Sequence, residues 1–213
     1  MSLKQLFQSA VQELQKRKIQ FAVAGGFAAD LYRQEPRLTM DVDLVIGADE
    51  SAASTAADIL EAIGLHAGLI RNADLAGGPR FAIKRKSTNL CMVVGRKKDD
   101  SSGEGVDILL PEIPWVEQAV TRAQSNLVDF GFGSVPALAV EDVILAKLYA
   151  LQAATLRAKD LDDIQSIFAA EPPIDLAYIS GQMQRLELTL PNQAKPFIPE
   201  TLLTIDRDNR RES

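Results

Sequence analysis

Two aspartates separated by one residue are the strongest chemical signal in this sequence. Asp41 and Asp43 open the apolar run DVDLVI, and residues two apart in a strand project from the same face. The two carboxylates are therefore expected side by side, with Val42 and Leu44 on the opposite, packed face. Neighbouring carboxylates repel unless a cation lies between them, and Mg²⁺ is typically held by one or two carboxylates plus substrate phosphates. The alternative is a pair of solubilising acids on an edge strand, although VDLVI is very apolar for an exposed edge.

A glycine pair lies just upstream of these acids. Gly25 and Gly26 separate the apolar run FAVA from a short helical pattern, FAADLYR. Glycines at the start of a helix allow backbone N–H groups to approach an anion closely. A simple strand-to-helix turn is the alternative for the same pair. Thr39 and Arg37 come just before the acids and are placed to contact a nucleotide or phosphate, while a solvent-exposed loop position is the alternative for Arg37.

The order and spacing of these residues resemble the signature of the nucleotidyltransferase superfamily, which has the polymerase-β-like fold. That signature is Gly-Gly or Gly-Ser, a short helix, Asp-x-Asp or Asp-x-Glu on a strand, and a third carboxylate on a neighbouring strand. Asp107, in the run GVDILL, is the candidate third carboxylate; the alternative is an acid that merely ends a loop before a strand. The resemblance extends from about Phe21 to Phe168 and is closest to bacterial AbiEii-type toxins and antibiotic nucleotidyltransferases.

The resemblance implies a metal-dependent enzyme that moves an NMP from an NTP to a hydroxyl or phosphate acceptor. Two Mg²⁺ (or Mn²⁺) ions would be held by Asp41, Asp43 and Asp107 and would stabilise the attacking and leaving oxygens of an in-line displacement. Asp107 is the expected general base, and Gly25 and Gly26 would grip the triphosphate. The acceptor would be RNA, tRNA or protein, as for a toxin. The alternatives are an antibiotic acceptor, or a catalytically silent nucleotide-binding module in a toxin–antitoxin complex.

A second set of candidates lies in the helical pattern near the C-terminus. Lys147 comes three residues after Ile144 and four before Leu151, so it shares a helix side with apolar residues. Either its stem snorkels over the core, or its charge reaches the triphosphate. Related nucleotidyltransferases are similar in having such a lysine, followed by an Arg/Lys–Asp cluster. The cluster here is Arg157, Lys159, Asp160 and Asp163. A solvated helix start is its alternative interpretation.

The apolar runs predict an α/β (α+β) fold, with a small mixed sheet, flanking helices and a helical C-terminal subdomain. Residues 1–136 are expected to form the nucleotidyltransferase catalytic domain and residues 137–213 the helical subdomain with a polar tail. Strands are expected at FAVA, DVDLVI, HAGLI, RFAI, NLCMVV and VDILL, whereas DFGFGSVP is interpreted as turn-rich. Helices are expected at residues 3–14, 49–63, 115–123, 140–152 and 160–168, the first of them capped by Ser2.

The composition indicates the class of protein and its cellular compartment. The 213 residues are 46% apolar and 24% charged, with a net charge of −6 and one cysteine, Cys91, which is expected to be a small core residue. One cysteine excludes an internal disulfide, and no signal-like or membrane-spanning run occurs. A cytoplasmic enzyme without a membrane partner is therefore expected. The only histidine, His66, lacks a Cys or His companion for a metal site.

A basic stretch is the candidate contact for an RNA acceptor. Between residues 71 and 98 eight basic residues stand against one acid, Asp74. They are Arg71, Arg80, Lys84, Arg85, Lys86, Arg96, Lys97 and Lys98. Such a patch is able to hold a polyanion, although solvated hairpin ends that protect a sheet edge are the commoner occurrence. An antitoxin protein is the other expected partner.

Overall fold

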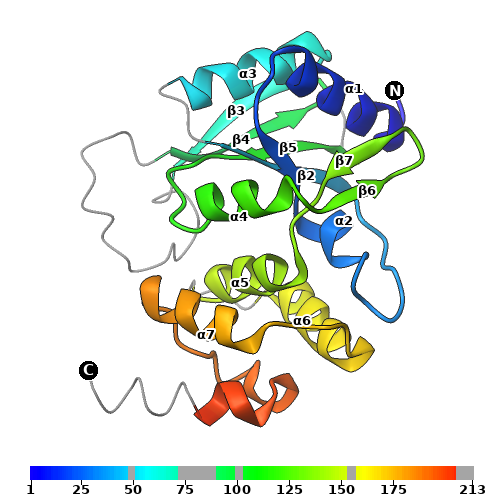
Figure 1. The fold of residues 1–213 in the computed structure, drawn as a ribbon. Coiled ribbons are helices and arrows are strands. Elements are labelled where there is room, and N and C mark those ends of the chain that lie inside the picture. Colours follow the sequence, from blue (N-terminus) through cyan, green and yellow to red (C-terminus); the bar gives the residue numbers. More distant parts are fainter. Residues whose placement is uncertain (48–50, 72–89, 99–102, 153–156, 205–213) are drawn as a thin grey trace.

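A five-stranded mixed sheet forms the centre of the chain in the computed structural model, which describes residues 1–47, 51–71, 90–98, 103–152 and 157–204. The strands are β1 (Phe21–Val23), β2 (Asp41–Ile46), β3 (His66–Arg71), β4 (Leu90–Arg96) and β5 (Gly105–Leu109). Their order across the sheet is β1-β2-β5-β4-β3 (Figure 1). The β2–β5 pair is parallel and the other pairs are antiparallel. The predicted fold class, with a small mixed sheet, is therefore confirmed.

Two helices cover one face of this sheet. They are α1 (Leu3–Lys16) and α3 (Ala52–Ala62), which lie together above the sheet in Figure 1. As predicted, Ser2 caps α1: its side chain accepts from the Gln5 N–H, while the Gln5 side chain accepts from the Ser2 N–H. The apolar stripe of α1 packs with Val42 and Leu44 of β2 in one core. The buried residues of this stripe are Leu6, Phe7, Ala10, Val11 and Leu14.

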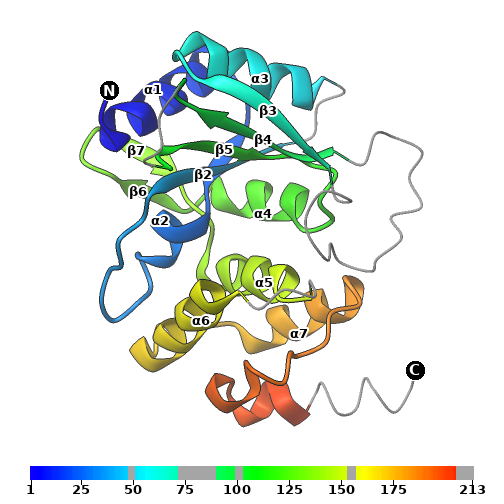
Figure 2. The same cartoon turned by 180° about the vertical axis from the view of Figure 1, so that it is seen from behind.

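The other face carries α2 (Gly25–Ala29), α4 (Val116–Ala123) and the C-terminal helices. These helices are α5 (Val140–Ala150), α6 (Ala158–Ala170) and α7 (Leu176–Arg185), followed by a 3-10 turn at Lys195–Phe197. Figures 1 and 2 show α5, α6 and α7 as a layer beyond α4, away from α1 and α3. A continuous apolar core joins Val45 and Cys91 of the sheet to Ile144 and Ile164 of that layer. None of the described helices is long and apolar enough to cross a membrane.

Several elements differ from those predicted. The turn-rich DFGFGSVP segment belongs to a two-stranded ribbon, formed by β6 (Leu127–Asp129) and β7 (Ser134–Pro136). Asp129 accepts hydrogen bonds from the N–H groups of Gly131 and Gly133, which closes the connection between the two strands. α2 stops at Ala29, before the FAADLYR pattern ends, and α7 was not expected. The predicted strand RFAI lies outside the described residues.

Hydrogen bonds join the ribbon to the start of the helical layer. Asn126 donates at 2.9 Å to both the Ala137 carbonyl oxygen and the Tyr32 hydroxyl. Tyr32 in turn donates to the Leu138 carbonyl oxygen at 2.9 Å, and the Leu138 N–H donates to Val23 of β1. The chain that leads into α5 is therefore anchored to β1 and to Tyr32, which follows α2.

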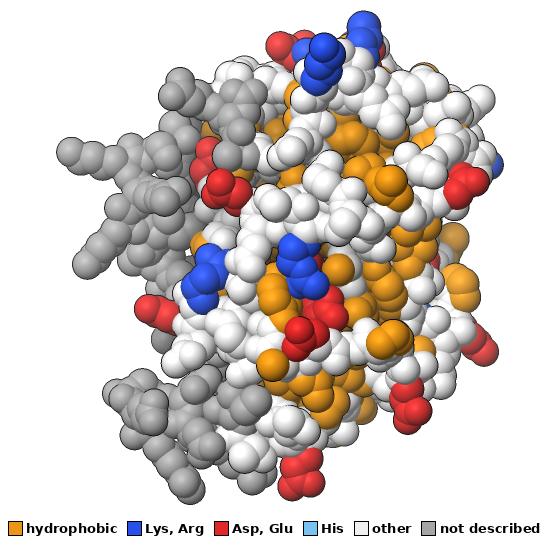
Figure 3. Space-filling view, viewed as in Figure 1, with side chains coloured by type: hydrophobic (Ala, Val, Ile, Leu, Met, Phe, Trp, Pro, Cys, Tyr) orange, Lys and Arg blue, Asp and Glu red, His pale blue; other side chains and the backbone are white. Residues whose placement is uncertain are grey.

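A charged cluster makes a second connection between the layers. Arg122 of α4 donates to Glu141 of α5 at 3.0 Å, and its guanidinium lies 3.7 Å from the centre of the Tyr178 ring of α7. Tyr178 donates to Asp142 at 2.8 Å. On the face of the molecule seen in Figure 3, Lys or Arg side chains lie beside Asp or Glu side chains near the middle. The position of α5 relative to the sheet is thus fixed by specific polar contacts as well as by the core.

Candidate active site

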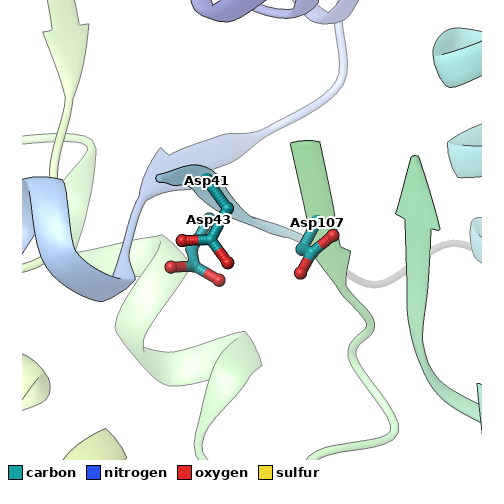
Figure 4. A group of neighbouring side chains, drawn as sticks. All are labelled: Asp41, Asp43 and Asp107. Atoms are coloured by element: carbon teal, nitrogen blue, oxygen red, sulfur yellow. The ribbon is translucent and has the colours of Figure 1, made fainter. Parts of the chain in front are cut away.

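Three carboxylates converge on one face of the sheet. The parallel pairing of β2 with β5 places Asp43 opposite Asp107, and Asp41 precedes Asp43 by two residues on the same strand. One oxygen from each of the three lies within 4.8 Å of the others (Figure 4). Val42 and Leu44 are fully buried on the other face, where the alternation of a strand places them. The structure therefore brings together the three aspartates that the sequence singled out.

The surroundings of these carboxylates disfavour negative charge. Burial, reinforced by the charges of Asp41 and Asp107, raises the pKa of Asp43 from 3.8 to about 7, although Lys147 acts in the opposite direction. Burial also raises the pKa of Asp107, and the hydrogen bond from Arg96 offsets only part of that rise. A divalent cation would relieve this repulsion. Carboxylate oxygens are the ligand type that Mg²⁺ prefers, so Asp41, Asp43 and Asp107 are the residues that would hold such an ion.

The glycine pair is shaped around Asp43. Gly25 has a φ of +56°, and a Cβ atom there would come 1.8 Å from an Asp43 carboxylate oxygen. The Gly26 N–H donates a hydrogen bond to Asp43, which favours its charged form. A Cβ atom at Gly26 would lie 2.7 Å from the Thr39 hydroxyl oxygen. The pair is thus more than a strand-to-helix turn, because its backbone and a candidate metal ligand share one small space.

A pocket of about 510 Å³ connects most of the predicted site residues. The three aspartates, Gly25, Gly26 and Lys147 all line it. Arg37 and the predicted Arg157, Lys159 and Asp160 also line it, and the rest of the wall is mostly apolar. Thr39 is not in the lining formed by the described residues. It lies behind Gly26 instead, with its hydroxyl 3.5 Å from the Arg37 carbonyl oxygen.

Lys147 is held between two aspartates of α6. Its Nζ atom lies 2.9 Å from an oxygen of Asp160 and 2.6 Å from an oxygen of Asp163. Lys147 is only 7% exposed, so the snorkelling interpretation is wrong. The solvated helix start is wrong for Asp160 and Asp163, which are 5% and 0% exposed, whereas Arg157 and Lys159 are exposed. A lysine–aspartate cluster therefore lines the pocket, while its contact with a triphosphate remains a prediction.

Asp163 gathers three cations. Arg37 donates to both of its oxygens at 2.8 and 3.0 Å, and Arg33 donates at 2.6 Å, in addition to Lys147. Burial alone would raise the pKa of Asp163, but hydrogen bonds from Arg37 and Lys147 outweigh burial and hold that pKa below its usual value. Burial likewise opposes the charge of Lys147, yet Asp160 and Asp163 raise its pKa overall. The loop before β2 is thereby fixed to α6, and Arg37 is not an exposed loop residue.

Arg96 is a site residue whose role the sequence did not reveal. Its two Nη atoms donate to the two oxygens of Asp107, the second at 3.0 Å. Arg96 ends β4 opposite Gly105, where a Cβ atom would come 2.5 Å from Arg96 Nη1. In the sequence Arg96 is one of eight similar basic residues, and only the register of β4 with β5 directs it to Asp107.

The rest of the basic stretch gives the RNA prediction no structural test. Residues 72–89 and the side chain of Arg71 lie outside the described residues. Two basic residues that are described are paired with acids: Arg96 with Asp107, and Lys97 with Glu104 at 3.1 Å. RNA contact through this stretch therefore stays a prediction.

Comparison with known families decides the assignment. A family model described as "Nucleotidyl transferase AbiEii toxin, Type IV TA system" matches residues 11–212. The chain belongs to this family. It is accordingly a nucleotidyltransferase, as the Gly-Gly and Asp-x-Asp signature implied, and the resemblance to AbiEii-type toxins is confirmed.

Solved structures of nucleotidyltransferases resemble this AbiEii-family chain at low sequence identity. An antigenic nucleotidyltransferase-like protein from Paracoccidioides brasiliensis gives a TM-score of 0.49 at 18% identity, covering 86% of this chain and 88% of that chain. ANT(2")-Ia in complex with adenylyl-2"-tobramycin gives 0.45 at 15% identity, covering 98% and 97%. A putative nucleotidyltransferase from H. pylori gives 0.43 at 14% identity, covering 98% and 92%. No curated protein matches the sequence.

The raised pKa of Asp43 predicts an inverse pH dependence of stability in the metal-free protein. The folded chain retains the Asp43 proton up to about pH 7, whereas the unfolded chain loses it near 3.8. The Asp43 contribution therefore lowers the free energy of unfolding as pH rises through this window. Asp43→Asn removes the charge but keeps an acceptor for Gly26, so at pH 8 it should stabilise the metal-free protein by up to about 4 kcal/mol. Urea unfolding at pH 5 and pH 8 measures this, and a variant no more stable than wild type at pH 8 contradicts it.

The burial of Lys147 predicts a large structural cost on its removal. Lys147→Met leaves Asp160 and Asp163 buried with one cation fewer, and breaking a buried ion pair costs about 3–5 kcal/mol. We expect the low end of that range, because Arg37, Arg33 and Arg157 remain. The matched control is Lys159→Met, an exposed pocket lysine, which should stay within about 0.5 kcal/mol of wild type. Equal urea midpoints for the two variants would show that Lys147 is not held as described.

Proposed function

We propose that this nucleotidyltransferase moves an NMP from an NTP to a hydroxyl or phosphate acceptor, using Mg²⁺ or Mn²⁺ held by Asp41, Asp43 and Asp107. The observation that carries the proposal is the convergence of these three carboxylates in one pocket with Lys147. When bound there, a divalent cation supplies charge neutralisation at the leaving pyrophosphate and lowers the pKa of an acceptor hydroxyl. The acidic cluster alone is common in proteins; its position beside the glycine pair and a buried cation supports this function.

The residues of the chain bind and orient the nucleotide. The backbone of Gly25 and Gly26 lines the pocket beside Asp43, where it is placed to contact the triphosphate. Lys147 is close enough to Asp43 to influence its pKa, and it offers the triphosphate a fixed positive charge. Thr39 contributes indirectly, by supporting Gly26 from behind. Asp107 is the proposed general base, because burial raises its pKa and so makes it a stronger proton acceptor.

The apolar part of the pocket is suited to the nucleobase. In the sheet, Val94 pairs with Asp107 and Met92 pairs with Leu109, so a row of apolar side chains follows the acidic row on the same face. Leu109 and Met92 line the pocket, as do Trp115 and Tyr149 from the elements around it. A volume of about 510 Å³ lies within the range of about 300–1,000 Å³ that is usual for small-ligand sites. We propose that the triphosphate lies over the acids and the base against this apolar wall.

The proposed functions are assigned to two consecutive parts of the chain. We propose that residues 1–136 form the catalytic domain and residues 137–213 a helical subdomain that supplies Lys147; the described elements after Pro136 are all helical. Membership of a toxin family supports an RNA, tRNA or protein acceptor and an antitoxin protein as partner. The alternatives to this function are a nucleotidyltransferase with an antibiotic acceptor and a catalytically silent nucleotide-binding module.

Metal-dependent nucleotide binding gives the direct test. Mg²⁺ together with an NTP at about 100 times its Kd should raise the melting temperature of wild type by about 5–10 °C. Asp41→Asn with Asp43→Asn should abolish that increment, because the shared metal face is lost, while each protein is compared with its own metal-free baseline. Asp58→Asn, an exposed acid on α3, is the matched control and should keep the full increment. An increment that survives in the double variant would overturn the metal-site proposal.

The single tryptophan reports on the apolar wall. Trp115 is the only tryptophan of the chain, is 6% exposed and lines the pocket. Binding of a Mg–NTP should therefore change its fluorescence, whereas Mg–tripolyphosphate, which lacks a base, should compete for the site without this change. If both ligands bind and neither alters the emission, the base lies elsewhere and only the phosphate half of the assignment remains.

A further inference from the structure

Asp107 has a direct cationic partner, Arg96. Both of its oxygens accept hydrogen bonds from Arg96, in the two-pronged geometry that makes arginine–carboxylate pairs strong. The neighbouring backbone accommodates the Arg96 side chain. Gly105 lies opposite Arg96 in the sheet and leaves room for the Nη1 atom. This Nη1 atom also donates to the Gly95 carbonyl oxygen at 2.9 Å. The position of Arg96 in this pair is therefore defined by contacts with the sheet, unlike that of an unconstrained surface arginine.

This contact conflicts with the proposed role of Asp107. Arg96 takes one lone pair on each Asp107 oxygen and places a positive charge beside them, so it competes with a cation or with the proton of an acceptor hydroxyl for this carboxylate. Asp41 and Asp43 have no such direct arginine partner among the described residues, since Arg37 and Arg33 are both taken up by Asp163. The three carboxylates are thus divided into a free pair and a third member that is held back.

Arg96 can separate from its carboxylate partner more easily than Lys147 can from its own. The Arg96 side chain is 37% exposed and pairs with a single carboxylate, whereas Lys147 has a side-chain exposure of 9% and lies between two. An arginine that leaves a carboxylate needs another anion, and phosphate matches the guanidinium fork as well as carboxylate does. The triphosphate of a nucleotide bound over Asp41 and Asp43 brings such oxygens to the same face of the sheet.

We propose that Arg96 is a substrate-operated switch on the third carboxylate: it holds Asp107 until an NTP binds, then exchanges Asp107 for a phosphate oxygen and frees Asp107 to join Asp41 and Asp43. This inference rests on the proposed function. The exchange makes and breaks only ion pairs and hydrogen bonds. After it, Arg96 faces phosphate and Asp107 faces the cation of the site, so neither charge is left buried without a partner. Arg96 is thereby a positioning residue that couples nucleotide binding to completion of the metal site.

Mn²⁺ binding followed by electron paramagnetic resonance tests the switch without turnover. In the absence of nucleotide, Arg96→Gln should tighten Mn²⁺ binding at least fivefold, because Asp107 becomes available. That gain should vanish in the Arg96→Gln/Asp107→Asn double variant. With α,β-methylene analogues of the four NTPs, Arg96→Gln should weaken analogue binding about tenfold. Arg96→Lys, which keeps the charge but loses the paired donors, should tighten Mn²⁺ binding less than Arg96→Gln does, and it replaces that variant if Arg96→Gln fails to fold.

Lys97→Gln is the matched control. It removes one positive charge at the next position, from a lysine that pairs with Glu104 rather than Asp107. It should change the affinity for Mn²⁺ and the affinity for the NTP analogues less than twofold. Equal effects of Lys97→Gln and Arg96→Gln, or unchanged Mn²⁺ and analogue binding in Arg96→Gln, would overturn the switch and leave a permanent structural pair. That outcome is distinct from failure of the function itself, in which wild type binds no Mn²⁺ even with the analogues present.

Discussion

The cost of burying negative charge governs this structure. Four of the described aspartates line one pocket, and a fifth, Asp163, is paired with Lys147 of its wall. The five fall into two groups whose negative charge is compensated very differently. Asp160 and Asp163 are matched by Lys147 and by arginines, so their charge is satisfied within the chain. Asp41, Asp43 and Asp107 have one direct guanidinium partner in the described part of the chain, and the pKa values of Asp43 and Asp107 are raised. A carboxylate group that the chain leaves undercompensated is suited to a cation from outside, and this is why we propose a metal site at Asp41, Asp43 and Asp107 and a structural role for Asp160 and Asp163.

Backbone geometry keeps the undercompensated group together. The parallel pairing of β2 and β5 sets Asp43 beside Asp107, and the left-handed conformation of Gly25 leaves space for the Asp43 carboxylate. Any side chain at position 25 would collide with that carboxylate, so the glycine and the aspartate constrain each other. The sequence motif of a glycine pair followed by two spaced aspartates therefore has a steric basis as well as a chemical one.

Local patterns made part of this site predictable. The alternation of apolar and acidic residues in DVDLVI is a property of one strand, and it placed Asp41 and Asp43 on one face without reference to the rest of the chain. Asp107 needed the resemblance to a family, because no local signal pairs β5 with β2. The partners of Asp163 could not be predicted at all: Arg33 and Arg37 lie 130 and 126 positions away in sequence. Arg96 was hidden among similar basic residues, since only strand register distinguishes it.

Ion pairs make the helical layer part of the candidate active site. Lys147 lies on α5, but its position depends on α6 through Asp160 and Asp163, and Asp163 also holds the loop that leads into Asp41. Moving α6 away would break the ion pairs of Asp163 with Arg33, Arg37 and Lys147, which is strongly unfavourable. The Asn126 and Arg122 contacts hold the start of α5, the helix that carries Lys147. The proposed release of Asp107 therefore needs only the rearrangement of one partly exposed side chain, Arg96, and no separation of the sheet from the helices.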